Sequence, residues 1–118
     1  MNRRIVFLSL SVLFFAVMSS FALESVRISG IDIPLPEGAE AVRIALPQSA
    51  QAKISSYEVG TPLDETVEFY ERFLKENGFV IIGGMGETGY SASIKKNAAM
   101  FTLNIYPRGD KTVIQFIW

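Results

Sequence analysis

The sequence predicts an α+β domain: a single antiparallel sheet of about six or seven strands with one amphipathic helix packed on one face, in the order β-β-β-α-β-β-β-β. Three observations support this fold class. Short segments of alternating apolar residues lie on both sides of residues 61–78, and only that stretch has a clear helical period. Short turn sequences join the later segments, as in antiparallel hairpins.

Three strand-like segments precede the predicted helix. In residues 25–33 the apolar side chains first occupy even positions, Val26 and Ile28, and then odd positions, Ile31 and Ile33. This shift predicts one strand with a bulge or bend at Ser29-Gly30. Two prolines in residues 34–38 then interrupt regular structure, because proline lacks a backbone donor and fixes φ. Residues 41–46 alternate as a half-buried strand, and residues 53–59 form a further strand.

The helix has a well-marked start and end. Thr61 is expected as the N-cap, its hydroxyl accepting from the backbone N–H of Asp64, with Pro62 in the first helical position. Gly78 suits the left-handed position that ends the helix. The apolar stripe between these ends consists of Leu63, Val67, Tyr70, Phe73 and Leu74.

This region resembles a segment of small exported bacterial proteins of unassigned function. The resemblance is a strand with an aromatic residue, a capped "P-x-D-E-x-x-x-F-Y" helix, and then glycine plus an aromatic residue. It implies an α+β domain and brings no activity, cofactor or site residue. The residues that carry it are Tyr57, Pro62, Asp64-Glu65, Val67, Phe69-Tyr70, Leu74 and Gly78-Phe79.

Four β segments follow the helix, joined by short turns that predict antiparallel hairpins. The first turn contains Gly84-Met85-Gly86-Glu87-Thr88-Gly89, a G-x-G-x-x-G pattern. A nucleotide-binding glycine loop opens a helix, whereas the residues after Gly89 alternate with period two, so we expect a hairpin loop. The predicted segments are residues 79–82, 90–95, 100–106 and 112–118, with the later turns at 96–98 and 107–110.

The N-terminus has the layout of a secretory signal peptide. Arg3-Arg4 precede an apolar stretch of about 14 residues, shorter than the ~20 residues that a membrane-spanning helix needs. Small residues at Ser20 and Ala22 predict cleavage after Ala22, giving a signal peptide at 1–22 and a single domain at 23–118. We therefore expect an exported protein, periplasmic or secreted, and the alternative is that the segment stays as an anchor.

Composition excludes several classes of function. Cleavage removes Arg3 and Arg4, so 9 basic residues remain against 12 acidic ones, which argues against a nucleic-acid partner. The chain has no cysteine and no histidine, so disulfides, cysteine metal sites and Ser/His/Asp or Cys/His catalysis are excluded. The sequence gives no reason to expect a cofactor or a metal, and the mature form is expected to lack a membrane span.

The last strand is apolar on both phases. Ile114, Phe116 and Trp118 alternate with Val113 and Ile117, although only one helix is predicted to cover the sheet. Either the strand is central and covered internally, or something covers the second face: a second copy, a partner protein, a small apolar ligand or residues 35–47. The predicted partner or ligand face contains Met100, Tyr106, Val113 and Ile117.

Two function classes remain open at this stage. The preferred hypothesis is an exported, non-enzymatic module of the cell envelope that binds a partner or ligand through a sheet face or edge. The alternative is a small enzyme that uses carboxylates or a lysine. Its candidate groups are the helix acids Asp64, Glu65, Glu68 and Glu71, and a serine and lysine among Ser91, Ser93, Lys95 and Lys96.

Overall fold

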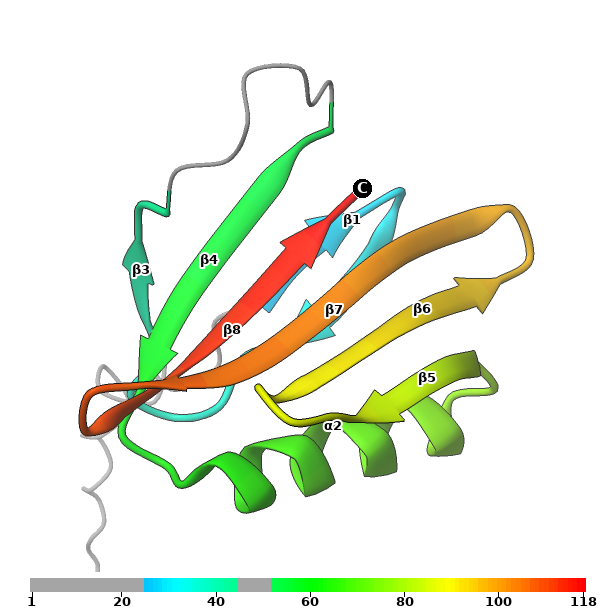
Figure 1. Cartoon of the computed structure of the whole chain (residues 1–118). Helices are drawn as coiled ribbons and strands as arrows, with labels where there is room; N and C mark the ends of the chain where they lie inside the picture. The colour runs from blue at the N-terminus through cyan, green and yellow to red at the C-terminus, as the bar shows by residue number, and fades with distance from the viewer. Residues whose placement is uncertain (1–24, 45–51) are drawn as a thin grey trace, which may run out of the picture.

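A computed structural model describes residues 25–44 and 52–118. It confirms the α+β class: within these residues one helix packs against an open antiparallel sheet of six strands (Figure 1). The strand order across this sheet is β3-β4-β8-β7-β6-β5. The elements are β1 Ser25–Ile28, β2 Ile31–Pro34, β3 Glu40–Val42, β4 Ile54–Val59, α2 Leu63–Glu76, β5 Val80–Met85, β6 Tyr90–Lys96, β7 Ala99–Arg108 and β8 Lys111–Ile117.

The helix carries the chain from one side of the sheet to the other. Strand β4 lies near one edge, and α2 leads from it to β5 at the opposite edge. Strands β5 to β8 then return by consecutive hairpins until β8 fits between β7 and β4, where residues 112–116 are buried. The last strand is therefore central in the sheet, which accounts for its apolar residues on both phases.

The first segment differs from its prediction. Residues 25–33 are not one bent strand, because Ser29 and Gly30 both have positive φ (51° and 82°) and reverse the chain. Such a two-residue turn joins antiparallel strands. Strands β1 and β2 consequently form a separate two-stranded sheet in which Val26 faces Ile33. The apparent slip of phase in the sequence is the point where the chain turns back.

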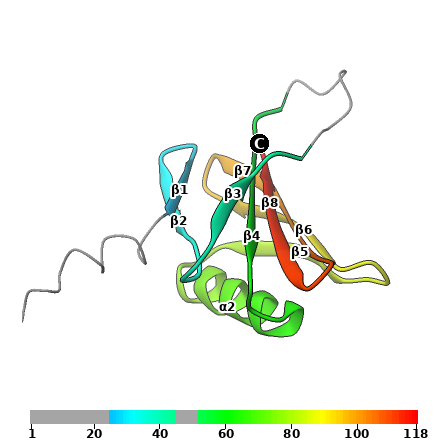
Figure 2. The same ribbon diagram turned by 90° about the vertical axis from the view of Figure 1, so that its left-hand side faces the viewer.

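The core lies between the six-stranded sheet and a second layer made of α2 and the β1–β2 hairpin. Figure 2 shows the hairpin and α2 close to each other, to the left of the sheet and below it. Both contribute to one apolar cluster, the hairpin through Ile28 and Ile33 and the helix through Tyr70 and Leu74. The sheet side of this cluster is Val59, Tyr90, Ala92, Ile94, Phe101, Leu103, Ile105, Ile114 and Phe116.

The helix ends are partly as predicted. The expected Thr61 cap is wrong, since Pro62 takes the N-cap position and no side chain caps the helix. The Thr61 carbonyl oxygen instead accepts from the hydroxyl of Thr112 on β8 at 2.7 Å. At the other end Gly78 has φ of 79°, and the Phe79 N–H donates to the Leu74 carbonyl, which confirms the predicted glycine stop.

Two sequence predictions fall partly or wholly outside the described residues. The signal peptide 1–22 with its cleavage after Ala22 lies within residues 1–24, and the end of the predicted strand 41–46 lies within residues 45–51. The described part of that strand is short, ending at Val42. Among the residues that are described, no helix is long and apolar enough to cross a membrane.

Candidate functional site

The sheet has one face on the core and one face that no described element covers, which we call the open face. Directly opposed residues on neighbouring strands share a face, so the register assigns each side chain. None of the open-face residues belongs to the core cluster. The open face contains Ile54, Ser56 and Glu58 of β4, Val80, Ile82 and Gly84 of β5, Ser91, Ser93 and Lys95 of β6, Met100, Thr102, Asn104 and Tyr106 of β7, and Val113, Gln115 and Ile117 of β8.

A row of hydrogen-bonded polar side chains crosses the middle of the open face. Ser91 donates to Asn104 Oδ1 at 2.7 Å, Asn104 donates to Gln115 Oε1 at 3.2 Å, and Gln115 donates to Ser56 Oγ at 3.3 Å. These four residues, the polar row, are directly opposed across β6, β7, β8 and β4. Gln115 and Ser56 are buried, so the row satisfies polar atoms that would otherwise be costly.

The four residues predicted from the sequence all lie on the open face, but they differ in exposure. Met100 is 57% exposed, and Tyr106 and Ile117 are half-buried. Val113 is 0% exposed, because it lies between Tyr106 and Glu58 in the register and Arg108 reaches across to Glu58 at 3.8 Å. A partner on this face could touch the first three residues and not Val113.

A hollow of about 330 Å³ lies at one end of the open face, beside the turn between β5 and β6. Its lining combines the half-buried ring of Tyr106 with two members of the polar row, Ser91 and Asn104. Thr88, Gly89 and Tyr90 complete it. The end of the glycine pattern, residues 86–89, forms the predicted hairpin turn, and the chain after it is strand β6 rather than a helix. Gly84 and Met85 belong instead to β5, which runs to Met85 and not to the predicted residue 82.

Two parts of this face were not predicted from the sequence. The first is the polar row, for which Gln115 in the middle of an apolar strand was the available signal. The second is the pair Val80 and Ile82 on β5, which are 56% and 59% exposed. Together with Met100 on β7 they make the edge of the open face markedly apolar, and this region is continuous through the register at Lys95 and Ser93.

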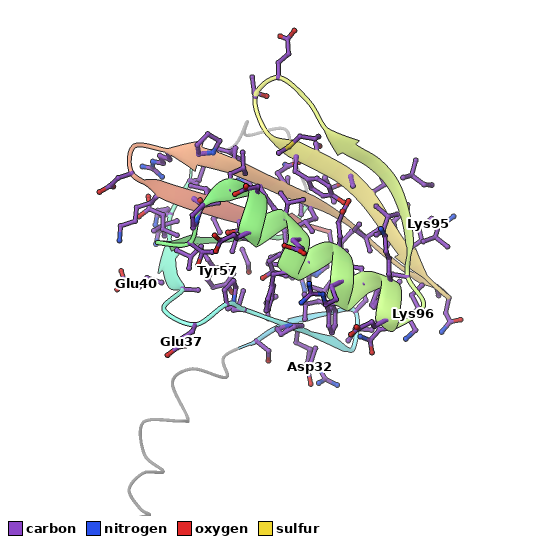
Figure 3. The ribbon with its side chains drawn as sticks, turned by 90° about the horizontal axis from the view of Figure 1, so that it is seen from below. Asp32, Glu37, Glu40, Tyr57, Lys95 and Lys96 are labelled. Carbon is purple, nitrogen blue, oxygen red and sulfur yellow. The ribbon has the colours of Figure 1, made fainter. Side chains whose placement is uncertain are left out.

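The residues considered for catalysis are dispersed. Asp64, Glu65 and Glu68 are exposed on α2, on the opposite side of the sheet from the open face. Figure 3 shows Lys95 and Lys96 at one end of the molecule and Glu37 and Glu40 near the other. Ser93 and Lys95 share the open face and are exposed, whereas Lys96 lies over the Phe79 ring at 5.1 Å on the core side. Within residues 25–44 and 52–118, no cluster of acidic side chains could hold a metal ion.

Two buried tyrosines on the core side have strongly shifted acidity. Burial raises the pKa of Tyr70 well above its usual value, with a smaller effect of Tyr57. Burial also raises the pKa of Tyr90 to about 12, and the nearby Glu71 carboxylate adds to the shift. Within the described residues no group meets hydrogen-bond geometry with the buried Tyr90 hydroxyl, so Glu71 is close enough to raise its pKa but does not satisfy it geometrically.

Comparisons with known proteins add no assignment. No protein-family model, no curated protein and no solved structure matches the chain.

Proposed function

We propose that the protein is an exported, non-enzymatic binding module of the cell envelope that holds a partner protein against its open face. One observation carries the proposal: α2 and the β1–β2 hairpin both pack on the same face of the sheet. The other face keeps large apolar side chains in solvent, among them Met100 at 57% exposure. Exposed apolar area on a small domain is typical of an interaction surface.

The chemistry of the face favours a protein partner. The half-buried Tyr106 and Ile117 and the exposed Met100 supply apolar contact area, while Ser91 and Asn104 supply donors and acceptors within the same surface. Protein interfaces combine these features, being enriched in tyrosine and methionine with hydrogen bonds between apolar anchors. The buried end of the polar row fixes these side chains, so a partner would meet a surface that is already ordered.

The test is capture of binding partners from envelope extract by the immobilised protein, followed by mass spectrometry. The open-face variant is Met100→Glu, which places a charge opposite Lys95 on β6 and leaves the core untouched. The matched control is Phe69→Glu, a 36% exposed apolar residue on α2. We expect the wild type and Phe69→Glu to retain the same protein and Met100→Glu to lose it. Equal capture by all three proteins would contradict an interface on the open face.

A further inference from the structure

We propose that the protein also self-associates through the free edge of β5, with β5 of one copy pairing antiparallel to β5 of a second copy. Strand β5 is the last strand of the sheet and, among residues 25–44 and 52–118, pairs only with β6. Its sequence, Val80–Met85, has no charge and no proline, and three of its side chains are more than half exposed. Natural edge strands are usually protected by charge or proline, and a bare apolar edge is a template for another strand.

The hydrogen bonding at the turn shows which backbone groups of β5 are free. Gly86 N–H donates to the Gly89 carbonyl at 2.7 Å, in the same register as the β5–β6 pair. Hydrogen-bonded positions alternate along an antiparallel strand, so Gly84, Ile82 and Val80 bond to β6. The backbone groups of the other three residues, Ile81, Gly83 and Met85, therefore point away from the sheet.

One register pairs all three free residues at once. A two-fold axis at Gly83 places Gly83 opposite its own copy and Ile81 opposite the partner subunit's Met85. It also places Ile82, which is 59% exposed, opposite the partner subunit's Gly84. Gly84 has no side chain and so leaves room for the partner subunit's Ile82 on the open face, whereas Gly83 is already required within the subunit, where a Cβ would collide with Ser91 and Ala92 of β6.

Charge complementarity favours a second copy as the occupant. In this register the turn after β5, which carries Glu87, lies beside the start of the partner subunit's β5. At that start Lys96 Nζ lies 5.1 Å from the Phe79 ring, so Glu87 and the partner subunit's Lys96 come from neighbouring ends of the two edges. The two-fold axis repeats this opposite-charge contact, so the edge is complementary to itself at both ends.

The dimer does not depend on the proposed function. Edge pairing extends the sheet sideways and leaves the Tyr106 and Met100 region of the open face free. Interfaces formed by two short strands bury an area at the small end of the known range. We therefore expect a weak dimer with a dissociation constant on the order of micromolar.

The test is analytical ultracentrifugation of the protein as isolated from the cell. The fraction of dimer is measured over a series from micromolar to millimolar protein concentration. Ile82→Glu would place two charges near the axis and weaken the dimer by about a hundredfold or more, whereas Phe69→Glu would leave it unchanged. Glu87→Lys would weaken the dimer by about tenfold, and adding Lys96→Glu would restore it. A monomer at every concentration, or equal effects of Ile82→Glu and Phe69→Glu, would overturn the proposal.

Amide hydrogen exchange tests the register independently of these variants. Protection should rise with protein concentration at Ile81, Gly83 and Met85, and should stay constant at Val80 and Ile82, which already bond to β6. A dimer without this alternating pattern would overturn pairing through β5. Partner capture by a strictly monomeric protein would leave the proposed function standing, so the two failures are distinguishable.

Discussion

The hydroxyl of Tyr70 on α2 donates to the carbonyl oxygen of Pro34 at the end of β2, at 2.8 Å. The Tyr70 side chain is 0% exposed, and its ring packs edge-on against Phe116 of the central strand at 5.8 Å between centroids. One residue therefore connects the helix, the hairpin and the sheet. This contact holds the two parts of the second layer together on the core face, and so it keeps the hairpin away from the open face.

Removal of this hydroxyl should loosen the hairpin. Tyr70→Phe keeps the ring contacts but leaves the Pro34 carbonyl oxygen without its donor, which should cost about 1–3 kcal/mol of unfolding free energy. Urea unfolding measures the loss, and hydrogen exchange should locate it in β1 and β2. The matched control is Tyr57→Phe, at a half-buried tyrosine whose hydroxyl makes no hydrogen bond within the described residues; its effect should be small. Equal losses in the two variants would contradict this role for Tyr70.

The two buried tyrosines predict a loss of stability at alkaline pH. Their folded pKa values lie above the ordinary value of 10.0, so their contribution is fully present below about pH 10. Above that pH the unfolded phenols ionise, while folded Tyr90 stays neutral until about pH 12. Stability should therefore fall across this window by about 1.4 kcal/mol per pH unit for the deeply buried Tyr70, with a smaller additional loss from Tyr90.

The variant Tyr90→Phe separates the two contributions. At neutral pH it should leave the unfolding free energy unchanged or slightly raised, because the lost hydroxyl has no hydrogen-bond partner in the part of the chain that the structure describes. At about pH 11 the stability of this variant should exceed that of the wild type, since one of the two shifted groups is gone. Denaturant unfolding at both pH values is the measurement, and a variant that loses stability at neutral pH would show that the Tyr90 hydroxyl is satisfied after all.

Most of the fold was accessible from the sequence because its strands alternate cleanly and its helix has a single apolar stripe. The prediction at Ser29-Gly30 was wrong because the alternation of apolar residues shifts by one position both at a bulge and at a chain reversal. Only the φ angles of the two residues distinguish the two structures. The predicted N-cap at Thr61 was wrong, and the contact that Thr61 makes instead comes from the tertiary structure. Thr112 on β8, far away in sequence, donates to the Thr61 carbonyl, and a local pattern contains no information on that contact.

The open face could be predicted only in part, because it too depends on contacts between segments that are distant in the sequence. Alternation places Met100 with Tyr106, and Val113 with Ile117, on common faces, but which strands are neighbours is set by the crossover through α2. The polar row depends on that order, because Asn104 meets Gln115 only when β7 and β8 pair in this register. Exposure of β5 likewise follows from its position at the edge, which the sequence does not state.

The buried end of the polar row should contribute to the free energy of unfolding, whereas its exposed end should contribute little. Gln115→Ala removes the partner of Asn104 and of the buried Ser56 hydroxyl, and should cost about 1–3 kcal/mol of unfolding free energy. Ser91→Ala removes one exposed hydroxyl and should cost about 0.5 kcal/mol or less. Urea unfolding compares the two variants. Similar costs would show that the row does not act through burial.

Gly89 at the end of the turn should be required for strand packing. Gly89 has φ of 143°, and a Cβ there would come 2.5 Å from the Ile105 carbonyl oxygen and 2.8 Å from Tyr106 Cβ. Gly89→Ala should therefore destabilise the fold by about 1–3 kcal/mol, because β7 cannot move aside without breaking its pairing. Gly84→Ala is the matched control from the same pattern, since a Cβ there meets nothing within 4 Å and should be tolerated.

The same pair of glycine variants tests the rejected nucleotide site. The chain after Gly89 is strand β6, and no helix of the described residues begins at the turn. We therefore expect no measurable binding of ATP or NAD and no effect of either variant on it. Isothermal titration of the wild type and both variants with these nucleotides is the direct measurement. Saturable binding that Gly89→Ala abolishes at a temperature where the variant is still folded would mean that the glycines bind phosphate, and that their close approach to β7 is incidental.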